Sequence, residues 1–314
     1  MTPAGGSRAR LVVAHPERKA QRSLQRLVGA SLCPVEVVSD VAALCAAVDR
    51  EAIAVVDTGL ARATPELCER PGKAWIAVPG EGLAAADADS VGALLAAGWR
   101  HVISHPMPLL AEELLATVQK LVRADVFGLE KYVAWGAEVR SYALEDARDR
   151  DDAVTALAKD VVAVGLPERI GSLVSVIADE LLANALYAAP VDNTGTRFRA
   201  RDPRDQPRQL AERDHVTVRW ATDARYLAIE VRDRWGSIDV RAIGPRLAEL
   251  GKGKGAGAGD GGMGLALAYA CCNQLVIGCA PNELTEVIAL VDVRYKPTEL
   301  GRAGSFHAFT GKPT

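Results

Sequence analysis

The chain has 314 residues, of which 49% are hydrophobic and 25% are charged, and its formal net charge is −3 at pH 7. This length predicts two domains, each large enough to bury a core without metal or disulfide cross-links. The negative charge argues against a nucleic-acid binder, and no apolar run approaches the ~18 residues that a membrane span requires. Because residues 1–10 contain no apolar run, we expect no signal peptide, a cytoplasmic location, and neither membrane nor nucleic acid as a partner.

Six cysteines and five histidines are spread along the chain. No cysteine pair has zinc-ligand or redox spacing, and no histidine lies at ligand spacing from a cysteine. The sequence therefore predicts reduced thiols and no metal centre built from protein ligands alone.

Short apolar runs alternate with helical patterns over the first 126 residues. The runs are Leu11–Ala14, Val35–Val38, Ile53–Val56, Trp75–Val78 and His101–Ser104. The helical patterns include Val41–Val48, Ser90–Ala97 and Leu109–Val122. Apolar strands that alternate with helices predict an α/β domain over residues 8–125, with a doubly wound parallel sheet of the flavodoxin-like type.

The order of these elements resembles the receiver domain of two-component response regulators. Asp57 ends the third run, where receivers carry the aspartate that accepts a phosphoryl group. Ala14 and His15 replace the acidic pair that binds Mg²⁺ in receivers, and His105 replaces the lysine. Because phosphoryl transfer needs cations to neutralise developing charge, we expect Asp57 to open a turn and not to be phosphorylated. The domain is then a pseudo-receiver, which serves for docking or homodimerisation.

Residues 126–152 are predicted to form a helical linker. Apolar residues recur there at helical spacing, namely Leu129, Tyr132, Val133, Gly136 and Val139. The linker contains no histidine.

The segment Pro190–Asp214 is rich in Arg, Asp, Pro and Asn. Its arginines are Arg197, Arg199, Arg201, Arg204, Arg208 and Arg213. Its prolines disfavour regular structure, so we expect a solvated loop, with a phosphate or partner contact as the alternative.

Glu180 and Asn184 lie one turn apart on one face of the helical pattern Pro167–Ala189. A carboxylate and an amide side by side on a mostly apolar helix are costly unless a ligand or partner uses them. This pair is the first of four separated motifs in a second domain, which we assign to residues 153–296.

Asp233 follows the strand pattern Tyr226–Val231, and Gly236 comes three residues later. A carboxylate just past a strand end, followed by glycine, brings an acceptor next to a close approach of the backbone. Thr285 precedes the last strand pattern, Glu286–Val293, and residues 297–314 are assigned to a tail.

A glycine-rich run from Gly251 to Gly264 precedes the apolar helix Leu265–Cys271. It ends where backbone N–H groups and the helix dipole can receive phosphates. No strand precedes the glycines, as a dinucleotide fingerprint requires, and neither Lys252 nor Lys254 has the Ser or Thr that a P-loop requires.

In this order the motifs resemble the ATP-binding domain of the GHKL superfamily, which includes histidine kinases, anti-sigma-factor serine kinases, gyrase-type ATPases and heat-shock chaperones. The likeness covers about residues 152–293. It rests on ELxxNA at Glu180–Ala185, DxxG at Asp233–Gly236 and GGxGLxL at Gly261–Leu267. It implies a two-layer α/β sandwich that binds ATP and Mg²⁺.

The resemblance implies a role for each matching residue. Asn184 would coordinate Mg²⁺, and Glu180 would orient or deprotonate the attacking nucleophile. Asp233 would accept a hydrogen bond from the adenine amino group, with Gly236 beneath the base and Thr285 reaching adenine directly or through water. The residues implied to lie at the phosphates, or in the glycine-rich lid, are Gly262, Gly264, Leu265, Lys252 and Lys254.

Two positions depart from the family pattern. Tyr187 and Ala188 stand where the family often has a basic residue, so Lys252, Lys254 or an insertion arginine would have to bind phosphate instead. Arg234-Trp235 is bulkier than the usual motif. A family fold that has lost ATP binding is the alternative.

The nearest branch resembles the anti-sigma-factor and switch-protein serine kinases. The short helix Thr155–Val164 runs through Gly165-Leu166-Pro167 into the ELxxNA helix, as in that branch. Because the linker lacks a histidine, we expect no histidine autophosphorylation. Two hypotheses stay open: an ATP:protein serine/threonine kinase that acts on a regulatory partner, and a nucleotide-gated protein-interaction module without phosphoryl transfer.

Overall fold

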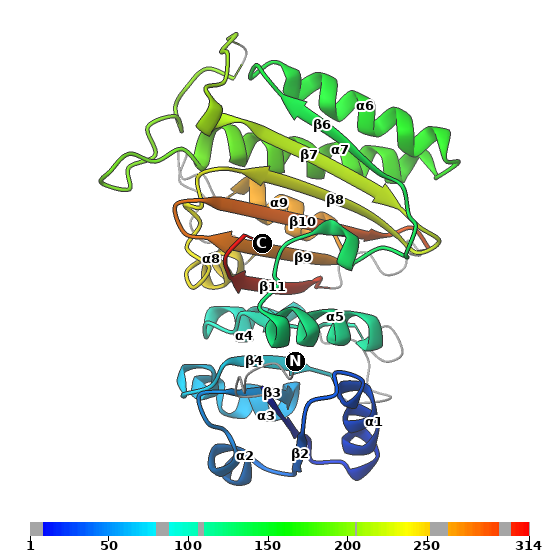
Figure 1. Ribbon diagram of the computed structural model, residues 1–314, viewed down its shortest axis with the longest axis vertical. Coiled ribbons are helices and arrows are strands. Elements are labelled where there is room, and N and C mark those ends of the chain that lie inside the picture. Colours follow the sequence, from blue (N-terminus) through cyan, green and yellow to red (C-terminus); the bar gives the residue numbers. More distant parts are fainter. Residues whose placement is uncertain are drawn as a thin grey trace, which may run out of the picture. The chain divides into compact units, whose positions relative to one another are not determined.

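The computed structural model describes residues 9–79, 88–105, 110–204, 206–251, 263–294 and 303–313. The chain divides into two compact units, an N-terminal unit over Met1–Asp125 and a C-terminal unit over Val126–Thr314. Both combine helices with a β-sheet, so the α/β class expected from the sequence is confirmed (Figure 1). Lys252, Lys254 and Gly262 lie outside the described residues.

The N-terminal unit contains a parallel sheet with the strand order β2-β1-β3-β4-β5. The strands are β1 (Arg10–Ala14), β2 (Val35–Val38), β3 (Ala52–Asp57), β4 (Ala74–Val78) and β5 (His101–Val102). The helices are α1 (Arg18–Gly29), α2 (Val41–Ala47), α3 (Thr58–Ala63), α4 (Ala88–Ala96) and α5 (Leu110–Arg123), with a 3₁₀ turn at Pro65–Glu69. Helix α1 packs against α5 and α3 against α4, and strands β3 and β4 are buried along their whole length.

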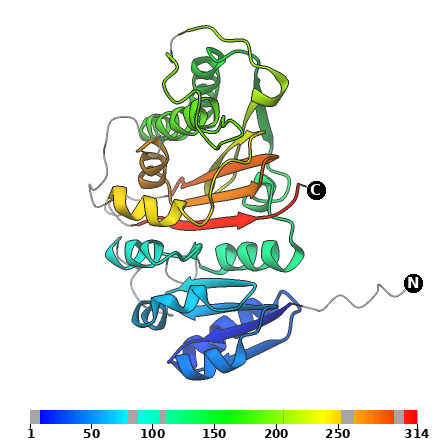
Figure 2. The same ribbon diagram turned by 90° about the vertical axis from the view of Figure 1, so that its left-hand side faces the viewer.

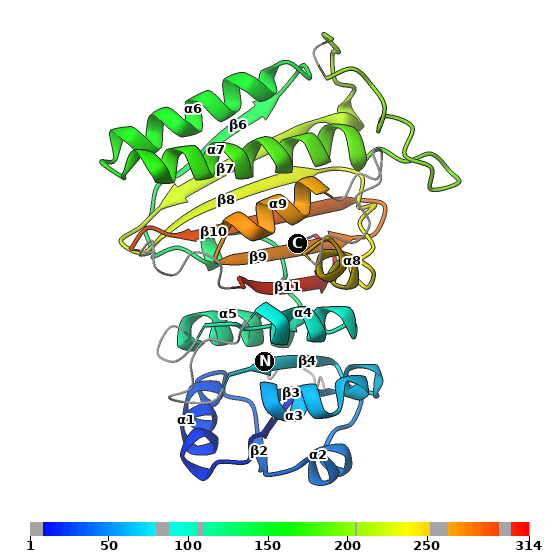
Figure 3. The same cartoon turned by 180° about the vertical axis from the view of Figure 1, so that it is seen from behind.

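The sheet of the C-terminal unit has the order β11-β9-β10-β8-β7-β6 and is antiparallel except for β11 beside β9. The strands are β6 (Val139–Leu144), β7 (Val216–Thr222), β8 (Tyr226–Asp233), β9 (Gln274–Ala280), β10 (Leu284–Asp292) and β11 (Ser305–Thr310). Helices α6 (Asp149–Ala163), α7 (Glu168–Ala183) and α9 (Met263–Cys271) cover one face of this sheet (Figures 2 and 3). Helix α8 (Ile243–Gly251), which the sequence analysis does not predict, packs against α9.

The helical linker predicted over residues 126–152 is wrong. This segment contains a 3₁₀ turn at Leu129–Lys131, strand β6 and only the first residues of α6. Gly128 and Gly136 have φ angles of +112° and +83°, which a right-handed helix does not contain. The helical spacing of the apolar residues does not reflect a helix. Leu129 is apolar because it is buried beside β7 and β8.

The assignment of residues 297–314 to a tail is also wrong for Ser305–Thr310, which form strand β11. Strand β11 pairs with β9 from Ser305↔Gln274 to Thr310↔Cys279. Phe306 and Ala308 are completely buried. A pattern of six residues is too short to distinguish a strand from a loop in the sequence. In the structure this strand pairs with β9 at the edge of the sheet of the C-terminal unit.

Helix α7 and a π-helical turn at Asn184–Ala188 form the centre of the helix layer. By length and composition alone, Glu168–Ala188 could cross a membrane, but 61% of its most apolar window is buried inside the unit. Packing of α7 against β7, β8 and β10 accounts for this apolar character.

Two buried carboxylates hold the segment that enters the C-terminal unit. Glu286 of β10 accepts the backbone N–H of Gly128 at 3.1 and 3.0 Å, and Glu230 of β8 accepts that of Leu129 at 3.0 Å. Both carboxylates are at most 1% exposed. The segment of residues 126–131 is therefore attached to β8 and β10, the two central strands of this sheet, by hydrogen bonds to buried carboxyl groups.

Arginines neutralise this pair of carboxylates only in part. Arg219 donates to Glu230 at 3.0 Å, and Arg232 donates to Glu286 at 2.6 Å and to Glu230 at 3.1 Å. Burial nevertheless raises the pKa of Glu230 to about 7, and the charge of Glu286 adds to this increase while both arginines oppose it.

The raised pKa predicts a specific pH dependence of stability. Native Glu230 retains a proton that the unfolded chain releases near pH 4.5, so its contribution to the free energy of unfolding falls as pH rises from about 4.5 to 7. Glu230→Gln keeps a neutral group, so its stability relative to wild type should rise by up to about 3 kcal/mol across this window. Urea unfolding at several pH values measures the difference, and a pH-independent difference contradicts the raised pKa.

Candidate functional site

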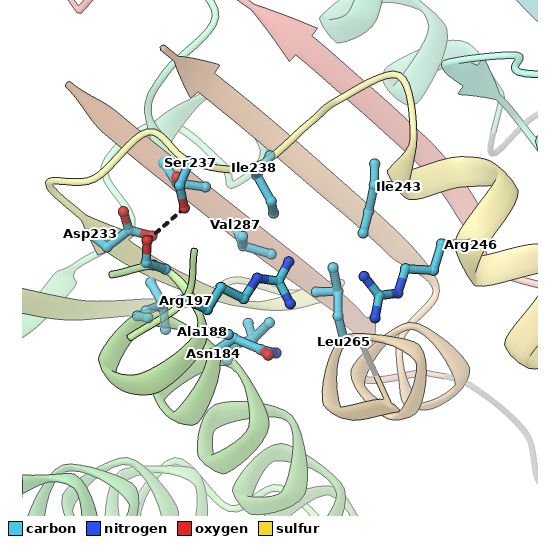
Figure 4. Close-up of a pocket in the computed structure, with 15 residues that line it drawn as sticks. Asn184, Ala188, Arg197, Asp233, Ser237, Ile238, Ile243, Arg246, Leu265 and Val287 are labelled. Atoms are coloured by element: carbon cyan, nitrogen blue, oxygen red, sulfur yellow. Dashed lines mark hydrogen bonds between the residues drawn. The ribbon is translucent and has the colours of Figure 1, made fainter. Parts of the chain in front are cut away.

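A pocket opens in the C-terminal unit between the helix layer and the ends of β8 and β10. Its empty volume is about 620 Å³, a value that includes solvent at the open mouth. Leu181, Val231, Leu265 and Val287 line it with apolar surface. The loop after β8 closes one side, where Ser237 donates a hydrogen bond of 2.7 Å to the carbonyl of Ala189 (Figure 4).

Asp233, the last residue of β8, lines this pocket and is 6% exposed. Its Oδ1 atom accepts the backbone N–H of Trp235 at 2.8 Å. Burial raises the pKa of Asp233 to about 6, while the N–H groups of Trp235 and Gly236 and the Thr285 hydroxyl oppose the increase. Thr285, which also lines the pocket, is paired with Asp233 in the β8–β10 ladder.

Asp233 differs from the other buried carboxylates in having no cationic partner among the described residues. Each of the other six buried carboxylates has an arginine or a histidine within 4.0 Å. These carboxylates are Asp57, Glu113, Asp214, Glu230, Glu286 and Asp292. A buried acceptor without a counter-ion, in a pocket, is what a ligand with a hydrogen-bond donor requires.

Gly236 is close to this carboxylate and packs against the β9–β10 turn. It has a φ of +56°, and an added Cβ would collide with the backbone of the β9–β10 turn at Ala280, Asn282 and Glu283. It does not line the pocket. Glycine is required here to bring the loop after β8 against that turn.

Asn184 and Glu180 come together with Gly264 at the start of α9. Asn184, the first residue of the π-helical turn, lines the pocket, and its buried Nδ2 has no hydrogen-bond partner among the described residues. An added Cβ on Gly264 would collide with the Glu180 carboxylate and lie 3.4 Å from Asn184 Nδ2. Gly264 therefore leaves space for both side chains, whereas Glu180 itself does not line the pocket.

Two arginines also line the pocket, of which the sequence analysis offers Arg197 only through its alternative of a phosphate contact and does not name Arg246. Arg197 comes from the segment expected to be a solvated loop, and Arg246 comes from α8. Figure 4 shows both guanidinium groups directed into the pocket, with Arg246 on the side away from Asp233. The clustering of arginines in residues 190–214 was the available signal for Arg197, and no sequence pattern marks Arg246.

Asp57 lies in the N-terminal unit at the end of β3. Its Oδ1 atom accepts the N–H of Leu60 at 3.1 Å and so caps α3, and Nε2 of His15 lies 3.4 Å from its Oδ2 atom. The N–H of Glu17 donates to Nδ1 of His15 at 3.0 Å. One oxygen of Asp57 thus caps α3, and the other lies beside the His15 ring.

Among the described residues, no group of three or more His, Cys, Asp or Glu side chains could hold a metal ion. The sequence matches no protein-family model and no curated protein. The function of the pocket has therefore to be inferred from its residues.

The two glycines predict different effects of the same substitution. Gly236→Ala should destabilise the protein by about 2 kcal/mol or more, because the new Cβ meets backbone at a positive φ. Gly264→Ala should change the free energy of unfolding by less than about 1 kcal/mol, because only the end of a flexible side chain must move and alanine favours the helix. Urea unfolding compares them, with Gly171→Ala in α7 as the control, and equal losses for both would contradict these roles.

Proposed function

We propose that the C-terminal unit binds ATP with Mg²⁺ in this pocket and transfers the terminal phosphoryl group to a serine or threonine of a regulatory protein in the cytoplasm. The observation that carries the proposal is Asp233, a buried carboxylate at the wall of the pocket that has no counter-ion in the described part of the chain. Asn184, Leu265 and Thr285 converge on the same pocket from separate parts of the chain, as the resemblance to the GHKL superfamily implies.

The residues around Asp233 fit an adenine ring. The carboxylate accepts a hydrogen bond from the exocyclic amino group, and Thr285 offers a hydroxyl beside it. Apolar side chains of Val231 and Val287 line the space on the same two strands. A charged acceptor in an apolar pocket discriminates strongly against bases that lack an amino group at this position, because the carboxylate would stay unpaired.

Asn184 fits a magnesium ligand. Mg²⁺ takes oxygen ligands, usually one or two from the protein and the others from phosphates and water. The buried amide has unused hydrogen-bonding capacity, and turning it presents the oxygen to the pocket. Bound MgATP supplies the electrophilic phosphorus. The protein orients this group from the π-helical turn, a distortion often found at functional sites.

Glu180 is proposed as the base that accepts the proton of the attacking hydroxyl. It lies one turn before Asn184 on the same helix face, and Gly264 gives its carboxylate room. A carboxylate beside the metal ligand can hold the hydroxyl in line with the phosphoryl group.

The N-terminal unit is proposed to be a pseudo-receiver that docks a partner or a second copy of the chain. Its strand order, β2-β1-β3-β4-β5, is that of flavodoxin-like domains. Asp57 ends β3, the position at which the resemblance implies a receiver aspartate. The contact of Asp57 with His15 and its capping of α3 support a structural role for this carboxylate.

One observation favours the alternative of a nucleotide-gated interaction module without transfer. Glu180 is directed at Gly264 and does not line the pocket. In that case nucleotide binding changes partner affinity through Asn184 and the start of α9, and no phosphoryl group moves.

Asp233 can be tested with adenosine, which lacks the phosphates that titrate near pH 6. Asp233→Asn removes a charged acceptor, so we expect adenosine affinity to fall by about 10- to 150-fold. In wild type, affinity should rise as pH increases through about 6, where Asp233 ionises. Calorimetry measures both, with the exposed Asp239→Asn as the matched control. Unchanged binding by Asp233→Asn excludes Asp233 from recognition.

Glu180 and Asn184 are predicted to separate binding from transfer. Asn184→Ala should weaken MgATP binding, because the metal bridges protein and phosphates. Glu180→Gln should retain binding but slow transfer by about 10²–10⁴-fold, as expected for a positioned general base. The exposed Glu168→Gln on the same helix serves as the control.

The measurement is paired: ATP affinity by calorimetry, and incorporation of labelled γ-phosphate into candidate partner proteins. Tight ATP binding without incorporation by wild type rejects the kinase and leaves the interaction module. Wild-type transfer by Glu180→Gln removes this residue from the mechanism.

A further inference from the structure

The proposed nucleotide requires cations for its phosphates, and the position after Asn184 that often supplies one in the resembled family carries Tyr187 and Ala188. Among the described residues, two arginines line the pocket, Arg197 and Arg246, and they reach it from separate parts of the chain. In the view of Figure 4 the guanidinium of Arg197 is directed toward that of Arg246 and lies between it and Asp233. The pocket thus has an acceptor at one side, one guanidinium near its centre and a second at the other side.

We propose that Arg197 and Arg246 bind the phosphates of a ligand in this pocket, and that the segment of residues 190–214 positions Arg197 there. The inference rests on the proposed nucleotide site and adds the residues that recognise its polyphosphate. Guanidinium groups bind phosphate oxygens through two parallel N–H bonds, which gives both affinity and orientation. A multiply charged anion is attracted to both groups.

The segment that carries Arg197 is held by its neighbours. Phe198 packs edge-to-face on Trp235, with ring centroids 5.9 Å apart, and Arg199 donates to Asp214 at 2.6 Å. The guanidinium of Arg213 lies over the ring of Trp235, 4.5 Å from its centroid. Trp235 is two residues from Asp233, so the segment is anchored, next to Arg197 and near its end, to the loop that follows Asp233.

Tyr187 anchors the same segment at Arg204 and Arg208. The guanidinium groups of Arg204 and Arg208 lie 5.9 and 5.2 Å from its ring centroid. Its hydroxyl donates to the carbonyl of Arg204 at 3.4 Å, and Arg208 donates to the carbonyl of Leu186 at 3.3 Å. The two positions that depart from the family pattern, Tyr187 and Trp235, are therefore the two anchors of the segment that brings a replacement cation.

The test compares four probes: adenosine, ADP, ATP and inorganic tripolyphosphate, measured by calorimetry. Arg197→Gln and Arg246→Gln should each weaken ATP binding by about 10- to 100-fold and tripolyphosphate binding similarly, because each loses charge-assisted hydrogen bonds. Adenosine affinity should stay unchanged in both. Arg201→Gln, an exposed arginine of the same segment that does not line the pocket, is the matched control and should bind all four probes as wild type does.

A second pair of variants tests the anchoring. Phe198→Ala should reduce ATP affinity by about 3- to 30-fold without affecting adenosine, because Arg197 loses its position but not its charge. Phe198→Tyr keeps the ring and should retain wild-type affinity. A loss with both variants, or a loss of adenosine binding with Phe198→Ala, contradicts the anchoring.

The outcomes distinguish this inference from the proposed function. ATP binding by wild type that both arginine variants retain overturns the inference and leaves the nucleotide site. Tripolyphosphate binding that depends on both arginines, without adenosine binding, supports the inference and rejects the adenine site. Absence of binding for all four probes overturns both.

Discussion

Burial of the Asp233 carboxylate is the constraint on which the rest of the candidate site depends. A carboxylate out of water is unfavourable unless donors surround it, and here the protein supplies mainly the N–H groups that follow it in the chain. To bring these groups close, the backbone must turn sharply after β8. That turn requires glycine at position 236, because the β9–β10 turn leaves no room for a side chain. The acceptor, the tight loop and the wall of the pocket are thus one structural unit.

The same two strands serve both faces of the sheet. Successive side chains alternate between faces, so Asp233 and Thr285 face the pocket while their neighbours Arg232 and Glu286 face the other way. On that second face, Glu230 and Glu286 hold the backbone of segment 126–131. Any change in the relative position of β8 and β10 therefore alters the pocket and the attachment of this segment together. Burial of two carboxylates in this cluster is costly, and it raises the pKa of Glu230 to about 7.

The sequence predicts well the features that depend on local pattern and poorly those that depend on distant partners. The apolar strands of the N-terminal unit and the helix with Glu180 and Asn184 follow from periodicity, and Asp233 follows from a strand end. Thr285, expected just before a strand over Glu286–Val293, lies inside β10 instead. Arg197 could not be singled out from the other arginines of residues 190–214, because the sequence does not reveal the contact of Phe198 with Trp235. The linker is mispredicted because spacing alone does not reveal that Gly128 has a left-handed conformation.

Comparison of the buried carboxylates explains why Asp233 is the one to assign to a ligand. Asp57 is matched by His15 and a helix cap, and Asp214 is matched by Arg199. Those acids stabilise a fixed local structure, because each has a cationic or histidine partner and its removal would leave that partner unpaired. Asp233 has only neutral donors among the described residues, and its pKa is raised accordingly. A fold gains no stability from such a group, so a ligand donor that restores the missing interaction is the simplest physical reason for its presence in a pocket.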